Sequence, residues 1–287
     1  MSGKVDFLYV GPAKTASTWL YKLLDSSPNI YIPSAKDLQF FDRAYSRGID
    51  WYLKYFPASA GVINGELSHD YILRSTRAAP RIAHHFPNIK MICCVRNPFD
   101  RALSGFSFLQ RNGLITSGAT IEESCAKWPE IIEGGEYFEN INYLLRYFNR
   151  NNLLLINYDD LERDPEMFAS TVFRFLGVEF EARDIVHRRV NAYSVSRSRA
   201  LSRIVKKGAL AVRAAGMPGI VGSIKTNEYV SRVIYKRSAE RPSLSPSDTE
   251  FLLSKFEGDL TCLQSYYGID VSSWIERAYK SVNGHGG

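Results

Sequence analysis

Long apolar runs are absent from this chain of 287 residues. No stretch approaches the eighteen or so consecutive apolar residues that a membrane-spanning helix needs. The N-terminus also lacks the charged-then-apolar order of a secretory signal peptide. From these absences we expect a soluble, cytoplasmic protein.

Cysteine is scarce, and its spacing argues against the common cysteine-based sites. The four cysteines, at positions 93, 94, 125 and 262, show no metal-ligand spacing. Cys93 and Cys94 are adjacent within an apolar run, which favours reduced thiols in the core. We therefore predict a reducing compartment and no metal site.

Neither a linker rich in glycine, serine and proline nor a repeat of fixed period divides the chain. We predict one domain over residues 1–287, with 281–287 a disordered tail. The net charge of +6 is unevenly spread, because Ala182–Arg241 holds 14 Lys and Arg against three Asp and Glu. Segment 190–241 is expected to be a basic lid or insertion, a solvated face, or a surface for an anionic glycan or a membrane.

Apolar runs alternate with amphipathic stretches along the first two thirds of the chain. Lys90–Val95 is a continuous apolar run of the kind found in strands buried on both faces. The alternation predicts an α/β fold with a mostly parallel sheet and helices on both faces. The expected strands are the start of Val5–Leu24, Asn29–Pro33, Val62–Glu66, Lys90–Val95 and Leu153–Asn157, and the expected helices are the end of Val5–Leu24, Ser75–Phe86, Phe99–Leu109, Ile141–Phe148, Glu166–Leu176 and Asp248–Tyr267.

The first strand ends in the loop GPAKTAST, residues 11–18, where a helix should begin. Backbone N–H groups at the start of a helix favour an anion, and Lys14 adds a cation beside three hydroxyl side chains. The loop differs from the nucleotide triphosphatase pattern G-x-x-x-x-G-K-[ST], since its lysine follows the glycine by three residues and the second glycine is absent. We interpret the loop as a phosphate cradle; the simpler alternative is a plain β-to-α turn.

Three later strand ends also carry reactive side chains. The third strand ends on Glu66, the fourth precedes Arg96 and the fifth precedes Tyr158. Carboxyl ends of parallel strands meet in one crevice, so these groups should lie near the first loop. Ser104 follows Arg96 by eight residues, and an arginine fork with a hydroxyl can hold one phosphate from two sides. No strand ends in an aspartate suited to magnesium, which favours anion binding without metal.

These residues resemble a known family, the sulfotransferases that use 3′-phosphoadenosine 5′-phosphosulfate (PAPS). GPAKTASTWL is similar to their 5′-phosphosulfate loop and CCVRNPFDRALSGF to their 3′-phosphate motif, while INYDDLERDPEMFASTVFRFLGV and RPSLSP resemble later segments. The resemblance covers residues 5–180 and implies a P-loop-like fold with PAPS as co-substrate. The donor contacts it implies are Lys14, Thr15, Ala16, Ser17, Thr18 and Trp19 in the first loop, Arg96 and Ser104 at the 3′-phosphate, Tyr158 at the fifth strand end, and Arg197 and Ser198 from a lid.

Within the family the likeness is nearer to heparan-sulfate-type and bacterial carbohydrate enzymes. AKDLQFFD is similar to their K-E-x-H-F-F-D segment, and GELSHDYIL to their E-K-[ST]-P-x-Y-F, which makes Glu66 the implied general base. Lys14 would assist cleavage of the donor. Gln39 replaces the usual histidine, and Leu67 with His69 replaces the usual lysine and proline. His69 is the second candidate for the base.

The acceptor is less defined than the donor. Lys36 is a candidate second cation facing the sulfuryl group or an acidic acceptor, and Trp51 a candidate platform for a sugar ring, with solvent and core positions as the respective alternatives. We predict sulfuryl transfer to a hydroxyl on a carbohydrate or glycolipid, with no nucleic-acid partner and peripheral membrane contact through 190–241. The alternatives are a sulfotransferase of a small natural product, a polyanion- or nucleic-acid-binding protein, and a kinase-like enzyme.

Overall fold

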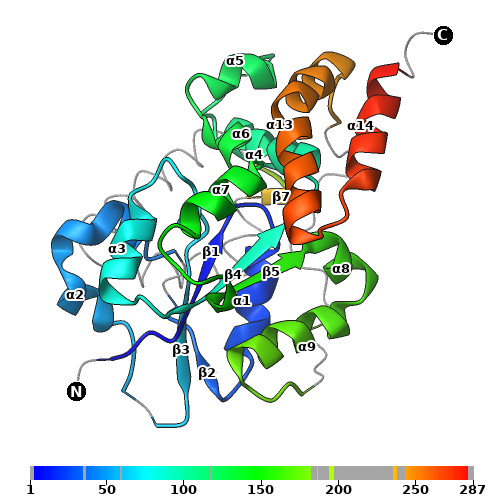
Figure 1. Ribbon diagram of the computed structural model, residues 1–287. Coiled ribbons are helices and arrows are strands. Elements are labelled where there is room, and N and C mark those ends of the chain that lie inside the picture. Colours follow the sequence, from blue (N-terminus) through cyan, green and yellow to red (C-terminus); the bar gives the residue numbers. More distant parts are fainter. Residues whose placement is uncertain are drawn as a thin grey trace.

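The computed structural model describes residues 3–34, 37–58, 60–116, 118–181, 186, 194–196, 235–237 and 243–283. Within these ranges a central sheet lies between helices (Figure 1). The predicted residues Lys36, Arg197 and Ser198 fall outside the described residues, as does most of segment 190–241.

The central sheet has five strands in the order β2-β3-β1-β4-β5, and every pairing is parallel. This confirms the predicted parallel sheet, with the second strand at its edge as expected. The carboxyl ends of the five strands lie along the same edge of the sheet, as the pairing of Val95 of β4 with Asn157 of β5 illustrates. The strands are β1 Phe7–Gly11, β2 Ile30–Tyr31, β3 Ile63–Leu67, β4 Lys90–Val95 and β5 Leu153–Asn157; β6 Ser194–Ser196 and β7 Tyr235–Arg237 form a separate antiparallel pair.

Alternate residues of the central strands enter two different cores, as the pleat of a sheet requires. Tyr9 and Cys94 pack with α1, α8 and α9 on one face. Leu8 and Cys93 pack with α3, α4, α7, α13 and α14 on the other. The two adjacent cysteines are therefore both buried and reduced, each on its own face, as the apolar run predicted.

The long helices match the predicted ones closely where the apolar spacing is regular. Gly177, with φ 79°, ends α9 in the left-handed conformation expected of a C-terminal glycine. The helical elements are α1 Ser17–Asp25, the π-helical turn Phe40–Ala44, the 3₁₀ turns Tyr45–Arg47 and Arg150–Asn152, α2 Ile49–Leu53, α3 Ala78–His85, α4 Pro98–Arg111, α5 Ile121–Cys125, α6 Glu130–Glu133, α7 Tyr137–Leu144, α8 Tyr158–Arg163, α9 Pro165–Leu176, α13 Pro246–Tyr267 and α14 Ser272–Asn283.

Two predicted boundaries are wrong. The helix expected at Ile141–Phe148 is α7, Tyr137–Leu144, because Asp259 of α13 accepts hydrogen bonds from the Phe138 and Glu139 N–H groups, both at 3.0 Å, and so caps an earlier start. Residues 281–283, expected in a tail, form the last turn of α14. Both helices are defined by long-range contacts that local spacing does not contain.

Candidate active site

The loop after β1 is supported from inside by a buried tyrosine. The Thr15 hydroxyl donates to the Pro12 carbonyl at 2.6 Å. The Tyr9 hydroxyl lies 2.6 Å from the Thr15 hydroxyl and donates to the Thr15 carbonyl at 2.9 Å. Since the Thr15 side chain is fully buried in this network, it shapes the loop, and its backbone is the part suited to touching a ligand.

Lys14 and Ala16 have left-handed backbone conformations, with φ of 74° and 63°. Residues other than glycine rarely adopt this conformation, which costs roughly 1 kcal/mol or more at each position. Left-handed residues within a turn make successive N–H groups converge, a geometry that binds anions. Ala16 is the N-cap of α1, so the loop adds the positive end of a nine-residue helix to this arrangement.

The Lys14 ammonium group lies 3.9 Å from the centre of the Phe108 ring on α4. Ser104 precedes Phe108 by four residues, and positions i and i+4 share one face of a helix. Ser104 therefore occupies the side of α4 that faces the first loop. The predicted phosphosulfate loop and the predicted 3′-phosphate helix are in direct contact.

Arg96 contacts two other predicted donor-binding residues. Its guanidinium donates to the Lys14 carbonyl at 3.1 Å and lies over the Tyr158 ring, 4.7 Å from its centre. Its backbone is held by Tyr137 of α7, whose hydroxyl accepts from the Arg96 N–H at 3.2 Å and donates to the Arg96 carbonyl at 2.6 Å. The ends of β1, β4 and β5 thus converge on one guanidinium.

The residues after Arg96 shape the start of α4. Asn97 is buried, and its side chain accepts from the Phe99 and Asp100 N–H groups at 3.0 and 3.3 Å, which caps the helix. Arg101 is buried as well and donates to the carbonyl groups of Glu130 and Ile131. Burial lowers the pKa of Arg101. Asn97 and Arg101 have structural roles, and Arg96 presents its side chain to the site.

Glu66 of β3 is 1% exposed and is enclosed by hydroxyl groups. Tyr52 donates to Oε2 at 2.7 Å, Tyr71 donates to Oε1 at 3.0 Å, and Ser68 also donates to Oε1. Burial raises the pKa of Glu66 to about 7, although the three hydrogen bonds act in the opposite direction, and the charge of Asp37 adds to the increase. The carboxyl group therefore titrates near neutral pH, where a general base is most useful.

His69 lies beside the first loop, in contact with an aspartate that the sequence analysis did not single out. Its Nδ1 lies 2.5 Å from the Asp37 carboxylate, and its Nε2 lies 3.5 Å from Asp70. A Cβ added to Gly11 would lie only 1.8 Å from the His69 carbonyl oxygen, so the two chain segments are closely packed. The structure thus places the His69 backbone against the start of the predicted phosphosulfate loop, while Glu66 lies opposite Leu8 of β1, before that loop.

Comparison with known proteins identifies the family. The family model described as "Sulfotransferase domain" matches residues 4–207 of the 287. The chain belongs to the sulfotransferase family. Members of this family of enzymes use PAPS as sulfate donor, and the two phosphate motifs described above lie within the matched residues.

Curated relatives of this sulfotransferase-family chain share its sequence over part of their length. Bifunctional heparan sulfate N-deacetylase/N-sulfotransferase 3 of Homo sapiens is 35% identical over 196 residues, which is 60% of this chain and 22% of that protein. Bifunctional heparan sulfate N-deacetylase/N-sulfotransferase 4 of Mus musculus is 31% identical over 199 residues, with the same coverage. This chain therefore corresponds to about a fifth of the length of these relatives.

A solved structure shares the fold over nearly the whole chain. The sulfotransferase from Alicyclobacillus acidocaldarius covers 94% of this chain and 98% of its own, with a TM-score of 0.65 and 23% identity. At this level of identity the likeness concerns the fold. It agrees with the predicted P-loop-like sheet flanked by helices.

Two predicted tryptophans lie in apolar surroundings. Trp19 is 7% exposed, packs edge-on against Phe168 at 5.6 Å, and donates from its indole to the Val186 carbonyl at 3.3 Å. Trp51 is half-buried, with its ring 5.1 Å from that of Tyr55 and 6.2 Å from that of Phe40. Core packing, the alternative considered above for Trp51, accounts for most of the contacts of both side chains.

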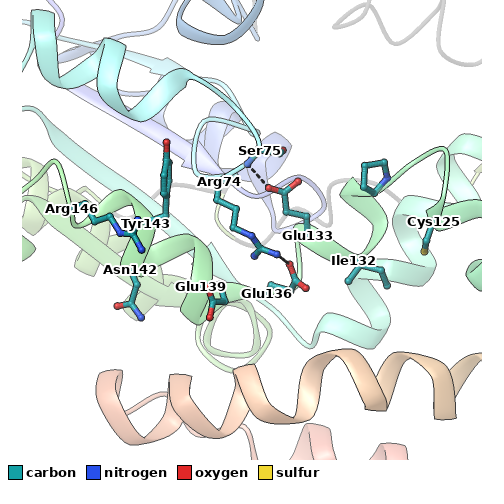
Figure 2. Close-up of a pocket in the computed structure, with 11 residues that line it drawn as sticks. Arg74, Ser75, Cys125, Ile132, Glu133, Glu136, Glu139, Asn142, Tyr143 and Arg146 are labelled. Atoms are coloured by element: carbon teal, nitrogen blue, oxygen red, sulfur yellow. Dashed lines mark hydrogen bonds and ion pairs between the residues drawn. The ribbon is translucent and has the colours of Figure 1, made fainter.

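A cavity of about 660 Å³ opens between the segment after β3 and helices α6 and α7 (Figure 2). Its wall includes the ion pair of Arg74 with Glu136 at 2.5 Å, and Glu133, which accepts from the Ser75 N–H at 2.6 Å. None of the residues predicted for the site lines this cavity. The polar groups on its wall are largely paired with one another.

Sequence reasoning missed the groups that surround Glu66 and His69. Asp37 and Ser68 belong to segments that resemble family motifs and Tyr52 lies outside them, and no periodic signal distinguishes any of the three from core or loop residues. Phe108 was missed because a single aromatic residue on a helix has no distinctive spacing. Within the described ranges, no group of three His, Cys, Asp or Glu side chains is placed to hold a metal ion. No helix in those ranges combines the length and apolarity needed to cross a membrane.

Proposed function

We propose that this protein transfers the sulfuryl group of PAPS to an acceptor on a carbohydrate or glycolipid. The observation that carries the proposal is the position of Arg96, whose guanidinium joins the Lys14 carbonyl to the Tyr158 ring. A guanidinium beside the first loop supports the binding of a second phosphate there, as a donor with phosphates on the 3′ and 5′ positions of its ribose requires.

The donor would lie across the carboxyl ends of β1 and β4. The N–H groups of the first loop, with Ser17 and Thr18 at the start of α1, would bind the 5′-phosphate. Arg96 and Ser104 would bind the 3′-phosphate and so distinguish this donor from ordinary nucleotides. Lys14 would neutralise the charge that develops on the leaving phosphate oxygen.

The transfer step would begin with attack of the acceptor oxygen or nitrogen on sulfur. A new bond to sulfur forms while the bond from sulfur to the bridging oxygen of the 5′-phosphate breaks, and adenosine 3′,5′-bisphosphate leaves. The acceptor loses one proton, which Glu66 accepts as its carboxylate. His69, held by Asp37, is the second candidate for this proton, because its backbone lies against Gly11 at the start of the same loop.

The acceptor class rests on the relatives. Both curated relatives named above are heparan sulfate N-sulfotransferases, which supports a glycan acceptor and adds an amine to the hydroxyl expected from the sequence. A buried carboxylate that titrates near pH 7 suits either group. A small natural product is the alternative acceptor.

Two further proposals concern the rest of the chain. We propose that residues 1–287 form one domain, with the basic segment 190–241 as a lid from which Arg197 and Ser198 reach the 3′-phosphate. Contact of this segment with an anionic membrane is an additional proposal. Substitution of Arg197 and Ser198 by alanine should weaken binding of adenosine 3′,5′-bisphosphate if the lid is correct.

Donor binding can be tested by thermal unfolding with and without adenosine 3′,5′-bisphosphate. A ligand that binds only the folded state raises the melting temperature. Arg96→Ala should lose most of this increase, since a charge-assisted bidentate contact is worth roughly 100-fold in affinity. Arg163→Ala, at an exposed arginine of α8, is the matched control and should keep the increase. Equal protection in both variants would contradict the assigned donor site.

Acceptor class can be tested with PAPS labelled in its sulfate group and two forms of one polysaccharide. Heparosan with free glucosamine amines offers amines and hydroxyls, whereas fully N-acetylated heparosan offers hydroxyls alone. Label in both products would indicate a hydroxyl acceptor, and label only in the first would indicate an amine. Protection by adenosine 3′,5′-bisphosphate without label in either product would favour the small-molecule alternative.

A further inference from the structure

The three hydroxyl groups around Glu66 come from separate parts of the chain. Tyr52 belongs to α2, whereas Ser68 and Tyr71 follow β3. All three donors are buried, and the Tyr52 and Tyr71 rings pack with Phe40 and Phe41 in one aromatic cluster. The carboxylate is therefore held by side chains whose own positions are fixed by packing.

Two backbone groups determine the direction of these hydrogen bonds. The Gln39 N–H donates to Ser68 Oγ at 3.2 Å, and the Phe41 N–H donates to the Tyr71 hydroxyl at 3.3 Å. A hydroxyl group has one proton to donate. Because each of these oxygens already accepts from an N–H group, its proton is directed to Glu66.

A carboxylate has about four acceptor positions, two on each oxygen. Ser68 and Tyr71 occupy those of Oε1, and Tyr52 occupies one on Oε2. One position on Oε2 is left over from these three bonds. A further hydrogen bond from a substrate would therefore be accepted by Oε2 of Glu66.

We propose that Tyr52, Ser68 and Tyr71 are positioning residues, which hold the Glu66 carboxylate with one position on Oε2 directed to the proton of the acceptor. This inference rests on the proposed function, in which Glu66 is the base. It adds to that function the groups that orient the base and the atom that takes the proton.

The charges around Glu66 give the proposal a measurable consequence. Burial and the negative charge of Asp37 oppose ionisation of Glu66, and the hydrogen bonds from Ser68, Tyr52 and Tyr71 favour it. Removing one hydroxyl leaves the opposing effects in place. The pKa of Glu66 should then rise, by about one unit for each lost bond to the charged form.

The first experiment measures ionisation of Glu66 through protein stability and needs no acceptor. The free energy of unfolding of the unaltered protein is compared with that of Glu66→Gln from pH 4.5 to 9. The free energy of unfolding of Glu66→Gln, relative to that of the unaltered protein, should rise with pH and level off near the pKa of Glu66, about 7. The same comparison is made in proteins that also carry Tyr52→Phe or Tyr71→Phe. There the difference in free energy of unfolding should level off about one pH unit higher.

Tyr45→Phe is the matched control. Tyr45 lies in the same aromatic cluster, 5.5 Å from Phe40, but its hydroxyl contacts His85 at 3.0 Å instead of Glu66. In the Tyr45→Phe background, the stability gained from Glu66→Gln should level off at the same pH as in the unaltered protein. If Tyr52→Phe and Tyr71→Phe behave like Tyr45→Phe, the positioning role is wrong and the tyrosines serve packing alone.

The second experiment compares rates on the heparosan form that accepts sulfate. We divide kcat/KM of Tyr52→Phe by kcat/KM of the unaltered protein at each pH. Protonation of the acceptor affects both values equally and cancels in this ratio. This ratio should be about tenfold lower at pH 6 than at pH 9. A ratio that is constant across pH would contradict the inference while leaving Glu66 as the base. Full turnover in Glu66→Gln would instead exclude Glu66 as the base and favour His69, and absence of labelled product with the unaltered protein would overturn the proposed function, so these failures are distinguishable.

Discussion

Four residues other than glycine have left-handed φ angles in the part of the chain that the structure describes. They are Lys14, Ala16, Asp37 and Gln39, with φ between 53° and 74°. The first two lie in the predicted phosphate loop, and the last two belong to the segment whose N–H groups and carboxylate meet Ser68 and His69. Backbone strain concentrated in two loops that both contact the segment after β3 is typical of functional sites, where surrounding contacts hold the strained conformation.

Lys14→Ala should lower turnover more than it lowers donor affinity. We expect kcat to fall by about 100-fold, since the ammonium group would act on charge that develops during transfer. The dissociation constant of adenosine 3′,5′-bisphosphate should change by less than about threefold. Release of that product and calorimetric binding give the two values. Lys22→Ala, at an exposed position of α1, is the control, and an affinity loss as large as the loss of turnover would contradict the leaving-group role.

Glu66→Gln should abolish turnover and stabilise the protein at neutral pH. The folded-state pKa of Glu66 is about 7, above its ordinary value of 4.5, so the folded protein binds the extra proton between these two values. Stability therefore falls as pH rises from about 4.5 to about 7 and is then constant. The substitution removes this loss, which amounts to at most ~3 kcal/mol. Denaturant unfolding at pH 5 and pH 8 measures it, and an equal effect at both values would contradict the raised pKa.

At the scale of elements, the site depends on how closely the end of β1 approaches the segment after β3. Gly11 has a φ of 109° and lies against the His69 backbone. The Ser68 N–H donates to the Tyr9 carbonyl at 3.1 Å, and the Ile72 N–H donates to the Val10 carbonyl at 3.0 Å. These bonds hold the segment after β3, which contains His69, against the end of β1 where the predicted phosphate loop begins, and a side chain on Gly11 would separate the two segments.

Gly11→Ala should therefore destabilise the fold by more than about 2 kcal/mol and weaken binding of adenosine 3′,5′-bisphosphate. Gly258→Ala is the matched control, because this glycine lies within α13 and a Cβ there would meet nothing within 4 Å. It should gain about 0.5–1 kcal/mol from improved helix propensity. Denaturant unfolding compares the two, and a neutral Gly11→Ala would contradict the close approach.

At the scale of the whole molecule, the C-terminal helices complete the structure around the site. The buried Trp274 of α14 donates from its indole to the Asp159 carboxylate at 2.6 Å, next to Tyr158. Asp259 of α13 caps α7, whose Tyr137 holds the Arg96 backbone. These contacts connect α13 and α14 to residues predicted to bind the donor. Figure 1 shows α13 and α14 lying side by side.

The anion-binding groups of the site are cations, hydroxyls and backbone N–H groups. If these meet the charge on the donor, the reaction needs no divalent ion, in contrast to phosphoryl transfer by kinases. Turnover in excess EDTA should stay within about twofold of turnover in added magnesium. ATP with magnesium should not replace PAPS. Loss of turnover in EDTA, restored by magnesium, would contradict this chemistry and favour the kinase-like alternative.

The order and type of the main elements, and the proximity of Arg96 to Lys14, could be predicted from the sequence because their signals are local. Apolar runs such as Lys90–Val95 indicate buried strands, and reactive residues placed directly after them must meet at one edge of a parallel sheet. Arg96 and Lys14 were predicted in this way, and the structure brings them within 3.1 Å. The start of α7 could not be predicted, because Asp259 caps it from a helix 120 residues away.

The sequence by itself determined the parallel sheet, the loop after β1 as a candidate phosphate site and the candidacy of Glu66, since each depends on neighbouring residues or on strand ends. Only the tertiary structure decided how Glu66 is placed. Its burial, the hydroxyls of Tyr52 and Tyr71, and the Asp37 charge that together bring its pKa to about 7 come from three separate segments. The electrostatics of a buried carboxylate depend on every group packed around it, and that set exists only once the chain has folded.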